Sequence, residues 1–123
     1  MSLPVAIDDL VTALPRFGSG YLLTSTDGRV KVVTVDPTPS PPGLRIAAPG
    51  RGTLGNLAVN PAVTLVFPPL ETHGYTLLVD GTGVADGDDV VVAPASAVLH
   101  RPAAHADGPL PPDGCGHDCE PVT

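Results

Sequence analysis

Two runs of β-branched and apolar residues, joined by a tight turn, limit the folds that this chain can adopt. The runs are GYLLTST at 20–26 and RVKVVTV at 29–35, and Asp27-Gly28 lies between them. An Asp-Gly pair accepts the positive backbone angles of a two-residue hairpin loop, so we predict two antiparallel strands here. Alternation of side chains along the second strand puts Arg29 and Lys31 on one face.

The rest of the first hundred residues is predicted to form short strands with few helices. Further strands are expected in LRIAAP, AVTLVF, YTLLVDGTGVA and DDVVVAP, with a last one in SAVLHR. Short helices are expected over 5–14 and over TLGNLAVN, which Pro61 ends. The segment DPTPSPPG, with four prolines, is predicted to be a loop. The pattern is typical of a mainly β chain forming a small antiparallel barrel of about six strands.

A change of composition divides the chain after residue 103. The 123 residues are enough for one domain with one core, which we expect over 1–103. Residues 104–123 are rich in Pro, Gly, Ala and Asp, and they contain four acidic residues but no Lys or Arg. Such a tail cannot bury a core of its own, so any order in it must come from docking or from a metal.

Charge and composition argue against several kinds of partner. Six basic residues stand against thirteen acidic ones, and the chain has two Tyr, two Phe and no Trp. A nucleic-acid groove needs clustered cations and stacking aromatic rings, so we expect no nucleic-acid partner. No apolar run approaches the roughly 18 residues of a membrane helix, and the N-terminus lacks signal-peptide features. We therefore expect a cytoplasmic protein with no membrane partner.

A glycine-rich turn precedes the second expected helix. The letters GRGTLG place Gly50, Gly52 and Gly55 at the spacing of a dinucleotide-binding loop, but the surrounding strands are too short and antiparallel for that fold. A turn of this kind still exposes backbone N–H groups at the positive end of a helix dipole, which suits a phosphate. Arg51 can add a guanidinium, and Thr53 can donate to a phosphate oxygen. Alternatively, Thr53 is only the N-cap and Arg51 is a solvated charge.

The order of these elements resembles the pyridoxamine 5'-phosphate oxidase-like family of flavin-binding split barrels. The likeness covers about residues 5–102 and rests on GYLLTSTDGRVKVVTV, GRGTLGNLAVNPAVTLVF and LLVDGTGVA, in a composition similar to that of small actinobacterial members. It implies a six-stranded antiparallel split β-barrel with short helices. It also implies a homodimer that binds FMN or a deazaflavin coenzyme through the cofactor's phosphate at the dimer interface.

Carried over residue by residue, the resemblance implies a cofactor site in the loop and helix and on the second strand of the hairpin. The residues concerned are Gly50, Arg51, Thr53, Asn56, Lys31 and Thr34. One position departs from the family, because Thr53 stands where many flavin-binding members have a lysine. The loss of one charge-assisted phosphate contact is worth roughly ten- to a hundredfold in affinity.

The resemblance implies an oxidoreductase acting on a small-molecule substrate. In such a protein the flavin carries out the redox chemistry while the protein positions it, so no catalytic side chain is identified. The alternative is a non-catalytic module of the same fold that binds a small ligand or a metal. Cofactor reduction coupled to a second substrate distinguishes the two.

The tail carries the letters CGHDCEP, which place Cys115, His117 and Cys119 at alternate positions, with His105 upstream. Thiolate and imidazole are the ligands that zinc prefers, although the spacing differs from that of the usual zinc finger. Three interpretations stay open: a zinc or cofactor-related site, a disulfide or redox pair between the cysteines, and two free thiols.

Overall fold

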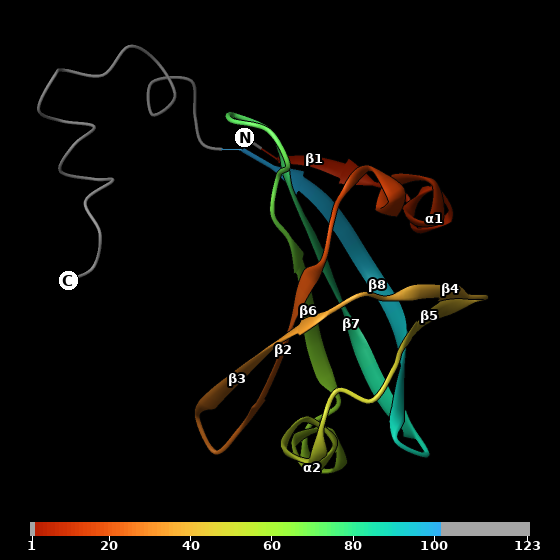
Figure 1. Cartoon of the computed structure of the whole chain (residues 1–123), viewed down its shortest axis with the longest axis vertical. Coiled ribbons are helices and arrows are strands. Elements are labelled where there is room, and N and C mark those ends of the chain that lie inside the picture. The colour runs from red at the N-terminus through yellow and green to blue at the C-terminus, as the bar shows by residue number, and fades with distance from the viewer. Residues whose placement is uncertain (1, 102–123) are drawn as a thin grey trace, which may run out of the picture.

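The computed structural model describes residues 2–101 of the chain. These residues form one antiparallel sheet of eight strands, with short helices near its two ends (Figure 1). In chain order the strands are β1 (Ser2–Val5), β2 (Gly20–Thr26), β3 (Arg29–Val35), β4 (Thr38–Ser40), β5 (Gly43–Ile46), β6 (Ala62–Phe67), β7 (Thr76–Asp86) and β8 (Asp89–His100). The tail from 104 to 123, with its Cys and His residues, lies outside the described part.

The strands are hydrogen-bonded in the order β3-β2-β6-β7-β8-β5-β4, and β1 pairs with the end of β8 that β5 leaves uncovered. Within the described residues β3 and β4 are the edges of the sheet, and they do not pair with each other. The barrel is therefore open between these two strands. The predicted mainly β, antiparallel fold is confirmed.

The strand count exceeds the prediction by two, because β1 and β4 were not expected. β4 lies inside the proline-rich segment predicted as a loop, and Thr38 pairs with Arg45 of β5. Proline is tolerated there because an edge strand leaves one side without hydrogen-bonding partners. β8 also runs without a break through the segment predicted as a separate last strand.

The helix predicted over 5–14 is shorter and less regular than expected. It consists of α1 (Leu10–Ala13) between two 3-10 turns, Ile7–Asp9 and Leu14–Arg16. Pro15 lies in the second turn, where it cannot continue an α-helix. Leu10 points into the core, so this segment covers one end of the sheet.

The hairpin of β2 and β3 forms as predicted. Asp27 and Gly28 have φ angles of 52° and 76°, the positive values that a two-residue hairpin loop requires. Thr26 pairs with Arg29 across the turn, which fixes the register of the two strands.

The inner face of the sheet carries one apolar core. Side chains alternate along β7, so Leu77 and Val79 are buried while Asp80 is exposed on the outer face. The other core residues with no more than 2% exposure are Leu10, Leu22, Leu44, Ile46, Leu65, Phe67, Val90 and Val92.

The predicted second helix is α2 (Arg51–Val59), which packs its buried Leu57 against the core at the end opposite α1 (Figure 1). Gly50 is the N-cap residue, and no side chain caps the helix. The alternative that Thr53 is the N-cap is therefore wrong. Within residues 2–101, no helix is long and apolar enough to cross a membrane.

Candidate phosphate-binding site

Three of the six basic residues gather where the β2–β3 hairpin meets the start of α2. Arg29 and Lys31 of β3 line a hollow of about 710 Å³ together with Gly52 and Asn56 of α2. Arg51 is exposed in the first turn of α2, next to Gly52. Within residues 2–101, neither Arg29, Lys31 nor Arg51 takes part in an ion pair. We call these three residues the basic corner.

Lys31 packs directly against the helix at Gly52. A Cβ atom built on Gly52 would lie 2.9 Å from Lys31 Cε and 3.2 Å from Lys31 Nζ, so the end of the lysine side chain would have to shift to make room for it. Glycine at this position leaves the room that Lys31 occupies. The strand therefore brings a cation to the surface of α2.

The first turn of α2 faces solvent without a side-chain cap. Gly50 has a φ of 109°, a conformation that glycine adopts without strain, and the first turn contains no acidic residue. The first N–H groups of a helix have no partner within it, and the helix dipole adds partial positive charge at this end. This end of α2 therefore adds to the positive potential of the basic corner.

Asn56 fastens α2 to β2. Its Oδ1 accepts a hydrogen bond from Thr26 Oγ1 at 2.9 Å, and its Nδ2 donates to Thr24 Oγ1 at 3.0 Å. One turn later, Asn60 Nδ2 donates to the backbone oxygen and the hydroxyl of Ser25, both at 3.2 Å. Asn56 thus lines the hollow while both of its polar atoms bond to the protein, and it fixes the wall of the hollow.

Two of the predicted site residues lie away from the hollow. Thr53 is fully buried beside the core, and within the described residues its Oγ1 has no hydrogen-bond partner. Thr34 lies on the opposite face of β3 from Lys31, because side chains alternate along a strand. The structure thus brings Lys31 and Asn56 together beside the start of α2, where Gly50 and Arg51 lie.

Arg29 was not among the predicted site residues, although it lines the same hollow. The sequence could have identified Arg29 as a site residue, because Arg29 and Lys31 are two residues apart on a strand and so share a face.

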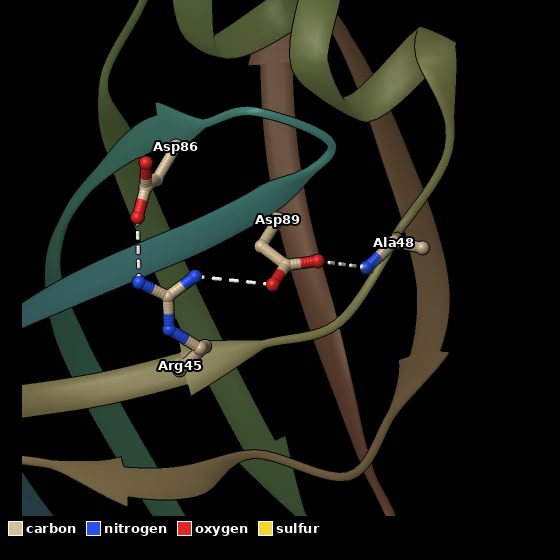
Figure 2. Close-up of polar contacts among 4 residues, drawn as sticks. All are labelled: Arg45, Ala48, Asp86 and Asp89. Carbon is tan, nitrogen blue, oxygen red and sulfur yellow. Dashed lines mark hydrogen bonds and ion pairs between the residues drawn. The ribbon is translucent and has the colours of Figure 1, made fainter.

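A hydrogen-bonded network holds the loop that leads into α2 (Figure 2). Arg45 of β5 donates through Nη2 to Asp86 at 2.6 Å and through Nη1 to Asp89 at 3.0 Å. The second carboxylate oxygen of Asp89 accepts the backbone N–H of Ala48 at 3.0 Å, and Ala48 has a positive φ of 38°. The β7–β8 turn therefore fixes the chain just before the start of α2.

The same network changes two pKa values. The backbone N–H of Ala48, and then the Arg45 guanidinium, hold the pKa of Asp89 below its ordinary value. Hydrogen bonds to Asp86 and Asp89 raise the pKa of Arg45. Both carboxylates are thus paired with Arg45, whereas Asp27, which lines the hollow beside Arg29 and Lys31, is in no ion pair among residues 2–101.

The described residues offer no metal centre. Residues 2–101 contain no group of three or more His, Cys, Asp or Glu side chains that is arranged to hold a metal ion. The predicted zinc ligands Cys115, His117 and Cys119 lie beyond this range.

Two mycobacterial proteins are similar to this chain over nearly its whole length. The uncharacterized proteins Mb0449c of Mycobacterium bovis and MT0457 of Mycobacterium tuberculosis are each 39% identical to it over 132 aligned positions. Each alignment covers 94% of this chain and 92% of the relative. No protein-family model matches the chain.

Solved structures share the fold at low sequence identity. A pyridoxamine 5'-phosphate oxidase-like protein of Listeria innocua has a TM-score of 0.61 and 12% identity over 76% of this chain and 96% of its own. The FAD binding protein of Mycobacterium smegmatis has a TM-score of 0.61 and 16% identity over 82% of this chain and 100% of its own. An FAD-binding protein of Mesorhizobium loti has a TM-score of 0.56 and 16% identity over 80% of this chain and 96% of its own. The chain therefore belongs to the same family as the two mycobacterial proteins and has the split-barrel fold of the pyridoxamine 5'-phosphate oxidase-like proteins.

Proposed function

We propose that this protein binds the phosphate of a flavin-type cofactor, either FMN, FAD or a deazaflavin coenzyme, at the basic corner. The observation that carries this proposal is that Arg29 and Lys31, without ion pairs among residues 2–101, line a hollow beside the uncapped start of α2, whose first residue is Arg51. In a chain with a large excess of acidic residues, such a cluster favours an external anion. A phosphate binds well at a helix N-terminus, and it also binds well to the guanidinium of arginine and the ammonium of lysine. Two solved structures with this fold are FAD-binding proteins, which supports a flavin.

The residues present fit the phosphate group of such a cofactor. The hollow of about 710 Å³ is large enough for a phosphate. Gly52, which has no side chain, lines it, and Lys31 lies against this glycine. Arg29 and Lys31 would hold the phosphate, while Asn56 keeps α2 in place against the hairpin. When bound, a flavin supplies hydride or electron transfer, and the protein binds and orients it. On this basis we propose an oxidoreductase that acts on a small molecule.

We also propose that the protein is a homodimer in which a second copy covers the outer face of β2 and β3. Tyr21, Val30 and Val32 lie together on this face with 41%, 64% and 53% exposure. Apolar side chains clustered on an open sheet face are typical of an interface. Val30 also lines the hollow at the basic corner, so a second copy on this face would lie beside the proposed site. We expect light scattering to give the mass of a dimer, and Val32→Lys to give a monomer; a monomeric wild type contradicts the proposal.

Cofactor titration followed by fluorescence tests the binding site. We expect the purified protein to bind at least one of FMN, FAD and a deazaflavin coenzyme with a Kd of about a micromolar or below. Arg29→Gln and Lys31→Gln should each weaken binding by about tenfold or more, because each removes a charge-assisted contact. Arg16→Gln is the matched control, because Arg16 lies after α1 at the other end of the sheet. Equal losses in all three variants would contradict a local site.

Turnover separates an oxidoreductase from a non-catalytic binding module. Anaerobic mixing of the loaded protein with candidate small-molecule reductants should change the cofactor's absorbance if the protein is an oxidoreductase. Tight binding without reduction by any of them would favour the module.

A further inference from the structure

A second hollow, of about 360 Å³, lies at the end of the sheet that α1 covers, opposite α2 (Figure 1). Its walls come from α1 and the 3-10 turn after it, from the β6–β7 loop at 68–75, and from β8. Two of the four aromatic residues of the chain, Phe17 and Tyr75, line it together with Leu99 and with Leu70, which is exposed. We call it the aromatic hollow. The cofactor site proposed above makes no use of it.

Both aromatic rings of this hollow have a partner that holds them in place. The ring of Phe17 lies against the ring of Phe67, which is buried in the core, with 6.3 Å between the centroids and an angle of 54°. The guanidinium of Arg101 lies over the ring of Tyr75, 4.7 Å from its centroid. Grooves lined by aromatic rings are the usual binding sites of proline-rich segments, which are extended before they bind and so lose little entropy.

The chain contains a proline-rich segment of this kind beyond the described residues. Positions 107–114 read DGPLPPDG, which includes a P-x-x-P motif and places Leu110 between prolines. Leu110 follows Arg101 by about nine residues. A chain of that length can span up to about 30 Å. Because Arg101 itself contacts the wall residue Tyr75, the segment can reach the aromatic hollow of its own chain.

Charge also favours this segment as the occupant. Arg16 lines the aromatic hollow and takes part in no ion pair in the part of the chain that the structure describes. Arg101 adds a second positive charge at the edge, whereas Glu71 is the one acidic residue among the described residues that line the hollow. The segment carries Asp107 and Asp113 on either side of its prolines and has no Lys or Arg. An aspartate next to Arg16 would make a charge-assisted contact.

We propose that residues 107–114 dock in the aromatic hollow of the same chain. Leu110 and the flanking prolines pack against Phe17 and Tyr75, and an aspartate of the segment lies beside Arg16. The short connection to β8 keeps the segment at an effective concentration in the millimolar range, so a weak contact is enough to hold it. This docking does not depend on the cofactor.

Nuclear magnetic resonance of the full-length protein tests the docking. With labelled leucine methyl groups and aromatic rings, we expect nuclear Overhauser effects from Leu110 to the rings of Phe17 and Tyr75. Leu110→Ser should shift the ring signals of both residues and leave those of Tyr21 unchanged, because Tyr21 lies on the outer face of β2. Val122→Ser is the matched control, because Val122 is an apolar residue of the tail outside the proline-rich segment. It should shift neither ring.

Arg16→Gln should weaken the effects between Leu110 and the two rings, because it removes the charge-assisted contact. A wild type with no effect between Leu110 and either ring overturns the proposal. A mixed sample, in which half of the molecules carry labelled leucine and half carry labelled rings, separates the two possible sources of the segment. Effects that persist between molecules in this sample would assign the segment to a second copy and overturn docking within one chain.

Discussion

Lys31 of β3 and Gly52 of α2 are in contact, and the glycine leaves the space that the lysine side chain fills. This contact puts an ammonium group at the start of a helix that has no acidic residue in its first turn. The neighbouring strand thus brings a second cation beside Arg51 of the same turn. In the proposed function, this lysine is one of the cations that would hold the phosphate.

Substitution of Gly52 by alanine tests this contact. The new methyl group should displace Lys31 and weaken FMN binding several-fold, while alanine adds helix propensity worth about 1 kcal/mol. Gly55→Ala is the control, because a Cβ atom there meets nothing within 4 Å. It should stabilise the protein by a similar amount without changing the Kd. Equal FMN affinity in both variants would contradict the proposed role of Lys31.

Thr53→Val is expected to stabilise the protein. The buried Oγ1 of Thr53 has no partner within the described residues, and an unsatisfied buried hydroxyl is costly. Its removal should raise the free energy of unfolding by about 1 kcal/mol, measured by urea denaturation. Thr24→Val is the contrasting variant, because Thr24 is also buried but accepts a hydrogen bond from Asn56. Thr24→Val should therefore lose stability. If Thr53→Val instead weakens FMN binding, Thr53 takes part in the cofactor site and the prediction is wrong.

Asn56→Ala should destabilise the protein by about 1–2 kcal/mol, because it removes the two hydrogen bonds that Asn56 makes to β2. Urea denaturation measures the loss. Thr26→Val, which breaks only one of these bonds, should cost less. An unchanged midpoint for Asn56→Ala would contradict a stabilising role for these two bonds.

The Asp89 network predicts a loss of stability in acid. The folded-state pKa of Asp89 is lowered, so the unfolded chain takes up this proton more readily than the folded one. The stabilisation is therefore fully present above the ordinary carboxyl pKa of about 3.8 and is lost as the pH falls through the lowered value. The Tm of Asp89→Asn should lie a few degrees below that of the wild type at pH 7, and the two should converge as the pH falls below the lowered pKa of Asp89. A constant difference across this range would contradict the prediction.

Local chemistry in the sequence was sufficient for much of the fold. The Asp27-Gly28 turn and the strands on either side of it follow from backbone preferences, which do not depend on distant residues. β4 could not be predicted in this way, because a proline-rich segment becomes a strand only when β5 lies beside it. The bulge at Asp80 likewise depends on how β8 passes Gly81.

The candidate site was only partly visible in the sequence. The glycine-rich turn marked the start of α2, but the spacing of residues did not show that Thr53 faces the core. The opposite directions of Lys31 and Thr34 follow from strand alternation alone. The contact of Lys31 with Gly52 could not be foreseen, because it depends on how the hairpin and the helix pack.

Comparison of FMN with riboflavin is the most direct test of the central claim, since the two differ only in the phosphate. Isothermal titration at fixed ionic strength should show that the wild type binds FMN at least about tenfold more tightly than riboflavin. This difference should largely disappear in the Arg29→Gln/Lys31→Gln double variant. Equal affinity of the wild type for FMN and riboflavin would contradict a phosphate site at the basic corner.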